Sequence, residues 1–365
     1  MKKIAIMTAG GDCAGLNSAI KSIVMTAKTQ GIETIGVMDG YIGFVEGIYV
    51  NLDEEVVRSI ETKGGTMLGS SNKECPFHYY NKKTGEFEDR VDEGIEKLRK
   101  QGVEGMVIIG GDGTLDSARV IYEHGMPTVG IPKTIDNDMS ASEPTIGFQT
   151  AIDAAVDAIR KLITTAYSHR RVMVVELMGR TSGYLTLYAG FASGADIILL
   201  PEQDYSLKAV CDKVDEIMKS GKRYVIIAIS EAAKEKGGEE TIAMLVKDSF
   251  EQKRYGGVSQ KLAAQIEQLT GYETRATILG HIQRGGEPTT SDIILGARLG
   301  NAACKLLING EPGYIVGMKG GSVVKMAFPK ERVPRVLNIE SDDLCRTARD
   351  MGVFLDRSRI WNIYL

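Results

Sequence analysis

Short apolar runs that end at glycine or at a polar cluster recur along this chain, and longer amphipathic segments separate them. Runs of this kind suit strands buried on both faces, and the longer segments suit helices. Their alternation predicts an α/β fold with mostly parallel sheets. We expect strands at 4–7, 34–38, 106–109, 128–131, 172–177, 197–200, 224–229 and 276–279, and helices at 16–29, 91–100, 150–165, 207–219, 257–269 and 291–308.

The length and composition narrow the class of protein. A chain of 365 residues is long for one domain, and a polar loop with Gly and Pro at 142–149 suggests a boundary between two. A net charge of −4 gives no general attraction for nucleic acid, and five scattered cysteines argue against a zinc site or a disulfide framework. No apolar stretch reaches membrane-spanning length, so we expect a soluble, cytoplasmic protein without a membrane partner.

Chemically distinctive clusters follow the expected strands. In chain order they are TAGGDCAGLN, GGDGT, PKTIDND, MGRTSG, SE and GHIQRGG. Ligands of open parallel sheets bind at the carboxyl ends of the strands, so we expect these clusters to converge on one crevice. Glycines let backbone amides approach a phosphate, and the helix that follows adds positive potential.

The segment GGDGT contains Gly111, Asp112, Gly113 and Thr114 between an expected strand and a helix. Its glycines permit close approach of a phosphate, and the carboxylate beside them is a natural partner for Mg²⁺. A strand-to-helix turn in which Asp112 caps the helix is the alternative.

The segment PKTIDND places Lys133, Thr134, Asp136 and Asp138 within seven residues. Phosphoryl transfer to an alcohol needs a carboxylate that accepts the hydroxyl proton and cations that stabilise the moving group. Asp136 is the candidate base, and Lys133 and Arg180 are the candidate cations. An Asp/Asn-rich loop without function is the alternative.

Further basic residues flank the expected strands, namely Arg171, Arg275, His281 and Arg284. The planar guanidinium of arginine can bind phosphate oxygens in pairs, which suits the fixed phosphate of a sugar phosphate. Each of them alone could equally be a solvated surface group. The chain has neither a Walker A motif nor a GxGxxG dinucleotide motif.

Taken in order, GGDCAGLN, GGTMLGSSN, GGDGT, PKTIDND, VVELMGR, ISE and ETRATILGHIQRGG resemble the 6-phosphofructokinase family from about residue 3 to 310. The resemblance implies two Rossmann-like three-layer domains with mostly parallel sheets. The nucleotide-binding domain would comprise 1–146 with about 283–333, and the sugar-phosphate domain 147–282 with about 334–365. It implies transfer of the γ-phosphoryl group of ATP to the 1-hydroxyl of fructose 6-phosphate, with Mg²⁺ as cofactor.

The resemblance also implies a role for each matching residue. Asp136 would be the base, with Thr134, Lys133 and Arg180 as the other catalytic residues. The sugar phosphate would contact Asp138, Arg171, Met178, Gly179, Glu231, Arg275, His281 and Arg284. The nucleotide side would comprise Gly11, Tyr41, Asn72, Lys73, Gly111, Asp112, Gly113 and Thr114, with Asp112 also holding the metal. Since family members contribute the matches of Arg171 and Arg275 from a neighbouring subunit, a homo-oligomer, dimer or tetramer, with shared active sites is implied.

Two positions bear on the phosphoryl donor. Pyrophosphate-using members of the family carry a second aspartate where this chain has Gly113, which favours ATP. Lys133, however, resembles the pyrophosphate-dependent group, so the pair looks like the ATP-using branch of an intermediate subfamily. Asn72 stands where bacterial ATP enzymes place an arginine, and Lys73 is the candidate substitute.

Three alternatives stay open from the sequence. A pyrophosphate-dependent fructose 6-phosphate 1-phosphotransferase differs only in its donor. Kinases of the NAD or diacylglycerol type share GGDGT but lack TIDND and GHIQRGG. A regulatory sugar-phosphate-binding subunit would be expected to lack the base or the cations that Asp136, Lys133 and Arg180 supply here.

Overall fold

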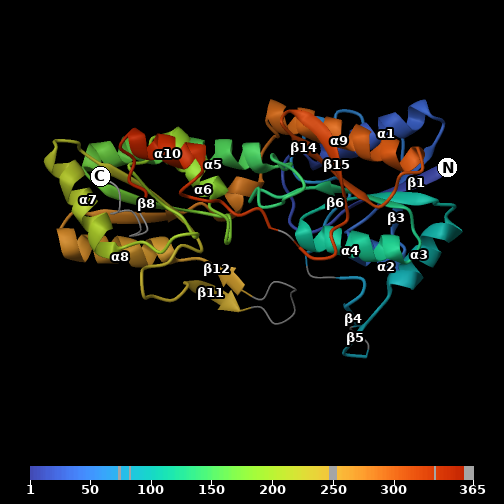
Figure 1. Cartoon of the computed structure of the whole chain (residues 1–365), viewed down its shortest axis with the longest axis horizontal. Coiled ribbons are helices and arrows are strands. Elements are labelled where there is room, and N and C mark those ends of the chain that lie inside the picture. Colours follow the sequence, from blue (N-terminus) through green and yellow to red (C-terminus); the bar gives the residue numbers. More distant parts are fainter. Residues whose placement is uncertain (73–74, 82–83, 246–252, 333, 357–365) are drawn as a thin grey trace. The chain divides into compact units, whose positions relative to one another are not determined.

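The computed structural model describes residues 1–72, 75–81, 84–245, 253–332 and 334–356, which fall into two compact α/β units (Figure 1). The first unit comprises the described residues among 1–150 and 284–335. The second comprises those among 151–246, 251–283 and 336–365. The α/β class with mostly parallel sheets is therefore confirmed.

The first unit is built on a seven-stranded sheet with the order β15-β14-β7-β6-β1-β2-β3. Its inner strands are parallel, whereas β15 and β3 pair antiparallel at the two edges. The strands are β1 (Lys3–Thr8), β2 (Glu33–Val37), β3 (Tyr49–Leu52), β6 (Gly105–Gly110), β7 (Thr128–Pro132), β14 (Tyr314–Lys319) and β15 (Ser322–Ala327). Every residue of β6 and β7 is buried, as expected for strands covered on both faces.

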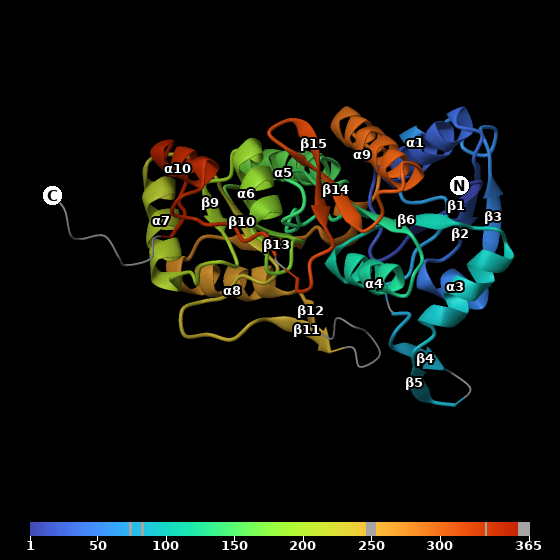
Figure 2. The same ribbon diagram turned by 45° about the vertical axis from the view of Figure 1, so that its right-hand side comes forward.

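Helices cover both faces of this sheet (Figures 1 and 2). On one face lie α1 (Leu16–Thr29) and α9 (Thr290–Ile308), and on the other α2 (Tyr41–Glu46), α3 (Val91–Lys100) and α4 (Asp112–Glu123). A short 3₁₀ helix, η1 (Ile60–Thr62), contacts α1, and a hairpin of β4 (Tyr79–Asn81) and β5 (Glu86–Glu88) precedes α3. The apolar core includes Met7, Phe44, Ile95, Met106 and Ile121.

The second unit contains a four-stranded parallel sheet with the order β13-β8-β10-β9. The strands are β8 (Val172–Leu177), β9 (Ile197–Leu199), β10 (Val225–Ser230) and β13 (Thr274–Ile278). One face carries α6 (Tyr184–Ser193) and α10 (Asp343–Asp350), together with α5 (Phe148–His169), whose first turn belongs to the first unit. The other face carries α7 (Leu207–Lys219) and α8 (Val258–Thr270) (Figure 2).

Two smaller elements complete the second unit. An antiparallel pair is formed by β11 (Ile242–Leu245) and β12 (Lys253–Tyr255). A 3₁₀ helix, η2 (Gly280–Arg284), follows β13 and spans the boundary between the units. The core includes Val174, Ile227, Val210 and Leu262.

Candidate active site

The glycine turn after β1 is held by its backbone carbonyls. The hydroxyl of Ser70 donates to the carbonyl of Gly10 at 2.5 Å, the ammonium of Lys133 donates to that of Gly11, and Nη1 of Arg284 donates to that of Asp12 at 3.1 Å. Gly10 has a φ of 82°, which a residue with a side chain rarely adopts. The turn of the predicted phosphate loop is therefore set by three side chains from distant parts of the chain.

The loop after β7 buries two opposite charges. Lys133 is 4% exposed and Asp136 is 6% exposed. Burial lowers the pKa of Lys133, the nearby guanidinium of Arg284 lowers it further, and the carboxylates of Asp136 and Asp12 oppose the shift. Since burial disfavours the charged form of Lys133, a bound anion would stabilise its ammonium. The residue therefore suits a site that receives anions.

A polar network fixes the backbone beside Asp136. The amide of Asp136 donates to Oγ1 of Thr134 at 3.1 Å. Asn137 has a φ of 52°, in the left-handed region, and its Oδ1 accepts hydrogen bonds from the amide and hydroxyl of Thr145 at 3.1 and 3.2 Å. The same hydroxyl donates to the carbonyl of Thr134 at 2.7 Å, so Thr145 closes the loop.

A buried carboxylate anchors the end of this loop. Asp292, at the start of α9, accepts from the amide of Gly147 and the amide of Thr150, each at 2.8 Å, and from the hydroxyl of Thr150 at 2.6 Å. These amides lie at the beginning of α5, where helical N–H groups need acceptors. Asp292 thus connects the loop to the helix that packs on the sheet.

The N-terminus of α4 presents the GGDGT residues. Asp112 is the first helical residue, preceded by Gly111 in an extended conformation and followed by Gly113. Burial raises the pKa of Asp112, and the positive charge of Arg332 partly offsets that shift. Thr114 is buried, and its carbonyl accepts a hydrogen bond from the hydroxyl of Tyr41 at 2.8 Å.

Asp112 is the residue that could hold a divalent metal. No group of three or more His, Cys, Asp or Glu side chains with metal-binding geometry occurs among the described residues. Mg²⁺ fits this arrangement nevertheless, because it is usually held by one or two carboxylates, by water and by the phosphates of its substrate.

Among the described residues just before the β4–β5 hairpin, Cys75 contacts α4. Asn72 is exposed, whereas Lys73, the candidate substitute for the missing arginine, lies outside the described residues. Cys75 is buried against the hydroxyl of Ser117 on α4 at 3.8 Å. The position of Asn72 is therefore known, and the prediction for Lys73 stays untested.

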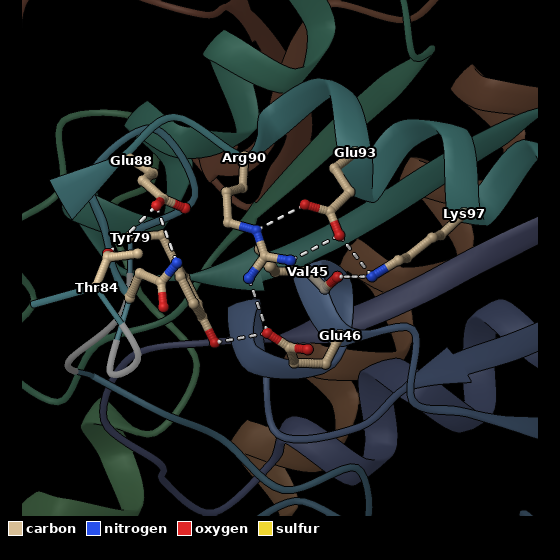
Figure 3. Close-up of polar contacts among 9 residues, drawn as sticks. Val45, Glu46, Tyr79, Thr84, Glu88, Arg90, Glu93 and Lys97 are labelled. Carbon is tan, nitrogen blue, oxygen red and sulfur yellow. Dashed lines mark hydrogen bonds and ion pairs between the residues drawn. The ribbon is translucent and has the colours of Figure 1, made fainter. Parts of the chain in front are cut away.

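An ion-pair network centred on Arg90 anchors the hairpin that follows this segment (Figure 3). The guanidinium donates twice to Glu93, at 2.6 Å each, and once to Glu46 at 2.9 Å. The hydroxyl of Tyr79 also donates to Glu46 at 3.3 Å, and Lys97 pairs with Glu93 at 2.8 Å. Mainly through hydrogen bonds from Arg90 and Lys97, the pKa of Glu93 falls to about 2. The hairpin is thereby joined to α2 and α3.

In the second unit, the loop after β8 carries Met178, Gly179 and Arg180. Gly179 has a φ of 136°, and a Cβ there would lie 2.6 Å from the carbonyl oxygen of Ser182. Arg180 has a φ of 50°, and its amide donates to Oε1 of Glu231 at 3.0 Å. Glu231, which follows β10, therefore lies beside the loop as the adjacent strands β8 and β10 require.

A second buried carboxylate lies on β8, the strand that precedes this loop. Glu176, on β8 and 1% exposed, accepts from the amide of Gly257 at 3.0 Å and from the amide and hydroxyl of Ser259 at 2.9 and 2.7 Å. It therefore caps the N-terminus of α8, as Asp292 caps that of α5.

Three predicted basic residues lie at the edge of the second sheet. Arg171 and Arg275 both pair with Oε1 of Glu273, at 2.7 and 2.6 Å. The pKa of Arg171 rises through its hydrogen bond to Glu273. His281 is exposed on η2.

The structure thus gathers the predicted residues into two groups, one within each unit. The first group comprises Gly11, Tyr41, Asn72, Gly111, Asp112, Gly113, Thr114, Lys133, Thr134, Asp136, Asp138 and Arg284. The second comprises Arg171, Met178, Gly179, Arg180, Glu231, Arg275 and His281. Four supporting residues escaped prediction, namely Asn137, Thr145, Glu176 and Asp292. For Asn137, the Asp-Asn-Asp sequence was an available signal, since Asn tolerates the left-handed conformation.

The described part of the chain contains no helix that is both long and apolar enough to cross a membrane.

A model of the phosphofructokinase family matches residues 3–307. The chain is 42% identical over 359 residues to ATP-dependent 6-phosphofructokinase 2 of Clostridium perfringens, covering 97% of this chain and 98% of the relative. It is 40% identical over 360 residues to ATP-dependent 6-phosphofructokinase 1 of Synechocystis, with coverage of 97% and 98%.

Solved structures show the same fold. The phosphofructokinase of Saccharomyces cerevisiae matches with a TM-score of 0.78 and 28% identity, over 90% of this chain and 45% of the yeast chain. This chain therefore spans less than half of that protein's length. The pyrophosphate-dependent phosphofructokinase of Nitrosospira multiformis matches with a TM-score of 0.80 over 100% of this chain and 95% of the other, at 17% identity. The latter likeness concerns the fold alone.

Proposed function

The chain belongs to the phosphofructokinase family, and from that premise we propose which of its residues perform the reaction. Relatives over nearly its whole length are ATP-dependent 6-phosphofructokinases, and this chain is likewise an enzyme that phosphorylates fructose 6-phosphate with ATP in glycolysis. We place the phosphoryl transfer at the 1-hydroxyl, which gives fructose 1,6-bisphosphate, and the enzyme in the cytoplasm.

The observation that supports this mechanism most is the pair of buried charges after β7. Asp136 is held by a network that includes Thr134 and is only 6% exposed. A carboxylate fixed in this way can accept the proton of the sugar 1-hydroxyl as its oxygen attacks the terminal phosphorus of ATP. Lys133 supplies positive charge on the same loop, which stabilises the transferring phosphoryl group.

The first unit is proposed to bind the nucleotide. The glycine turn containing Gly11, together with the start of α4 at Gly113 and Thr114, would receive the phosphates of ATP. Asp112 would hold Mg²⁺, which neutralises phosphate charge when bound. Tyr41 fixes the first turn of α4 through the carbonyl of Thr114.

The second unit is proposed to bind the sugar phosphate. Met178, Gly179 and Glu231 would hold the sugar, Arg180 would stabilise the transferred group, and His281 would bind the 6-phosphate. From the first unit, Asp138 would line the transfer site and Arg284 would bind the same 6-phosphate. The reaction therefore needs residues of both units.

We further propose a homo-oligomer, dimer or tetramer, in which Arg171 and Arg275 act on the site of a neighbouring copy. Within one chain both guanidiniums pair with Glu273, which directly precedes the edge strand of the second sheet. That strand is β13, where Ile278 is 45% exposed. An edge strand carrying basic and apolar groups suits an interface between copies.

A donor and acceptor panel on the purified protein tests the proposal. We expect fructose 1,6-bisphosphate to form with ATP and Mg²⁺, because Gly113 leaves room where pyrophosphate-using enzymes carry an aspartate. Product formed with pyrophosphate but not with ATP would contradict the assignment of the donor. A regulatory sugar-phosphate-binding subunit would bind fructose 6-phosphate without turnover with either donor. Conversion of another sugar phosphate in preference to fructose 6-phosphate would change the acceptor.

A further inference from the structure

Arg284 contacts the glycine turn of the first unit, although its proposed ligand is the sugar phosphate. Its Nη1 atom donates to the carbonyl oxygen of Asp12 at 3.1 Å. A Cβ atom placed on Gly11 would lie 2.8 Å from the same nitrogen, so the guanidinium packs directly on the turn. The contact joins two segments that are 272 residues apart in the sequence.

A second cation contacts the same turn. The ammonium of Lys133, which is 4% exposed, donates to the carbonyl of Gly11. A Cβ on Gly10 would lie 3.5 Å from this ammonium. The carbonyls of two successive residues, Gly11 and Asp12, are therefore each held by a different positive charge.

This arrangement sets the direction of the loop amides. No peptide bond among the described residues is cis, and in a trans peptide the carbonyl and the following N–H point in opposite directions. With the carbonyls of Gly11 and Asp12 turned toward the cations, the amides of Asp12 and Cys13 point away from them. Hydrogen bonds from charged donors are stronger than those between neutral groups, so they can hold this orientation.

We propose that Arg284 is a positioning residue for the nucleotide-binding turn, in addition to its proposed contact with the sugar 6-phosphate. This inference rests on the proposed function, in which the turn at Gly11 receives the phosphates of ATP. The bond to Asp12 uses one of the five N–H groups of the guanidinium, which leaves donors for a phosphate. A bound sugar phosphate would restrain the same guanidinium, and nucleotide affinity would rise.

Nucleotide affinity without sugar phosphate separates this role from simple sugar binding. The measurement is the Kd of a non-hydrolysable ATP analogue with Mg²⁺, by calorimetry, for the wild type, for Arg284→Lys and for the matched control His281→Ala. We expect Arg284→Lys to raise the Kd of the analogue by about tenfold, because the variant loses a charged hydrogen bond to Asp12. His281→Ala should keep the wild-type Kd for the analogue, although it should lower the affinity for fructose 6-phosphate.

Hydrogen exchange of the ligand-free proteins gives a readout independent of any ligand. The peptide covering residues 8–18 should exchange faster in Arg284→Lys than in the wild type or in His281→Ala. Gly11→Ala, whose methyl group would displace the guanidinium, should have an analogue affinity similar to that of Arg284→Lys. Combining the two changes should add little to either one.

Equal analogue affinity or equal exchange in Arg284→Lys and the wild type would overturn the inference while leaving the proposed function intact. Wild-type protein that binds the analogue and shows the Arg284 effect, yet does not phosphorylate fructose 6-phosphate, would support the inference and contradict the proposed function. Wild-type protein that binds no nucleotide would overturn both.

Discussion

The loop after β7 in the first unit and the loop after β8 in the second each contain a non-glycine residue with a left-handed backbone, but the surroundings of the two residues differ. Asn137 and Arg180 are both non-glycine residues in the left-handed region, with φ of 52° and 50°. Asn137 is buried and its own side chain ties the loop to Thr145, whereas Arg180 is exposed and its amide donates to Glu231.

The difference matches what each loop is proposed to do. A general base must stay within hydrogen-bonding distance of one proton, so a rigid, buried loop suits Asp136. A guanidinium that stabilises a moving phosphoryl group must be accessible to that group, which suits the exposed Arg180, whose backbone amide Glu231 holds. Left-handed conformations of non-glycine residues cost of order 1–3 kcal/mol, and they commonly mark functional sites.

The largest expected effect tests the rigid side of this comparison. Asp136→Asn keeps the size of the side chain but removes its ability to accept a proton. We expect turnover to fall by about 10³-fold or more, with a much smaller change in the affinity for fructose 6-phosphate. Steady-state kinetics and direct sugar-phosphate binding measure the two effects. Activity equal to that of the wild type would remove Asp136 from the mechanism.

The second prediction concerns the exposed loop, which carries Arg180. Arg180→Gln should lower turnover by about 10²-fold, because a neutral amide stabilises developing phosphoryl charge less than a guanidinium does. Because Arg180 is exposed and the hydrogen bond from its amide to Glu231 survives the substitution, the stability of Arg180→Gln should lie within about 0.5 kcal/mol of the wild type. A fall in stability as large as the fall in turnover would instead assign Arg180 a structural role.

The third prediction separates backbone strain from side-chain bonding at Asn137. Asn137→Gly accepts the left-handed conformation but loses the bonds to Thr145, whereas Asn137→Ala loses both advantages. We expect Asn137→Ala to be destabilised by about 2–3 kcal/mol and Asn137→Gly by about 1 kcal/mol less. Urea unfolding measures both. Equal values for the two variants would mean that the hydrogen bonds, and not the conformation, account for the cost.

The two buried carboxylates provide a matched pair of variants, one in each unit. Asp292→Asn and Glu176→Gln each remove an acceptor from a helix N-terminus, and each should destabilise the protein by about 1–2 kcal/mol. Asp292→Asn should also slow turnover several-fold, because Gly147 leads directly into the loop that Thr145 closes. If Asp292→Asn loses stability but keeps the wild-type turnover, the carboxylate of Asp292 contributes to folding and not to catalysis. Kinetics and urea unfolding of the two variants decide between these outcomes.

These supporting residues also show where sequence reasoning stops. Lys133 and Asp136 could be proposed because a dense polar cluster follows a buried apolar run, and the family match bears out the reading of the fold and the reaction. Asp292 could not, because it lies 142 residues from Thr150, and only tertiary packing brings them together. Glu176 is hidden within an apolar strand, where local patterns suggest no acceptor role.

The helices and strands can likewise be divided into those that the sequence predicted and those that it did not. The bounds of α1, α3 and α7 agree with the predicted ranges, because each has a clear apolar face and a polar boundary. In contrast, α6 was not predicted because it is apolar on nearly all sides, so no helical periodicity marks it. The antiparallel edge strands β3 and β15 were also missed, since their exposed residues interrupt the apolar runs that mark inner strands.

The smallest expected effect concerns Asp112, which shares the first unit with Asp136 but lies at a helix N-terminus. Burial raises its pKa above the ordinary 3.8, so its ionised form is less stable in the folded than in the unfolded chain. Asp112 is protonated in both the folded and the unfolded chain well below pH 3.8, and the loss of stability develops as the pH rises from there through the folded pKa.

Without metal, Asp112→Asn should therefore be slightly more stable than the wild type at pH 7, by less than about 1 kcal/mol, and this advantage should shrink as the pH falls. Urea unfolding at several pH values in EDTA measures it, and a difference independent of pH would mean that Asp112 keeps an ordinary pKa. Because added Mg²⁺ would stabilise the wild type alone, the same series with Mg²⁺ also tests whether the carboxylate is kept for metal binding at a cost in stability.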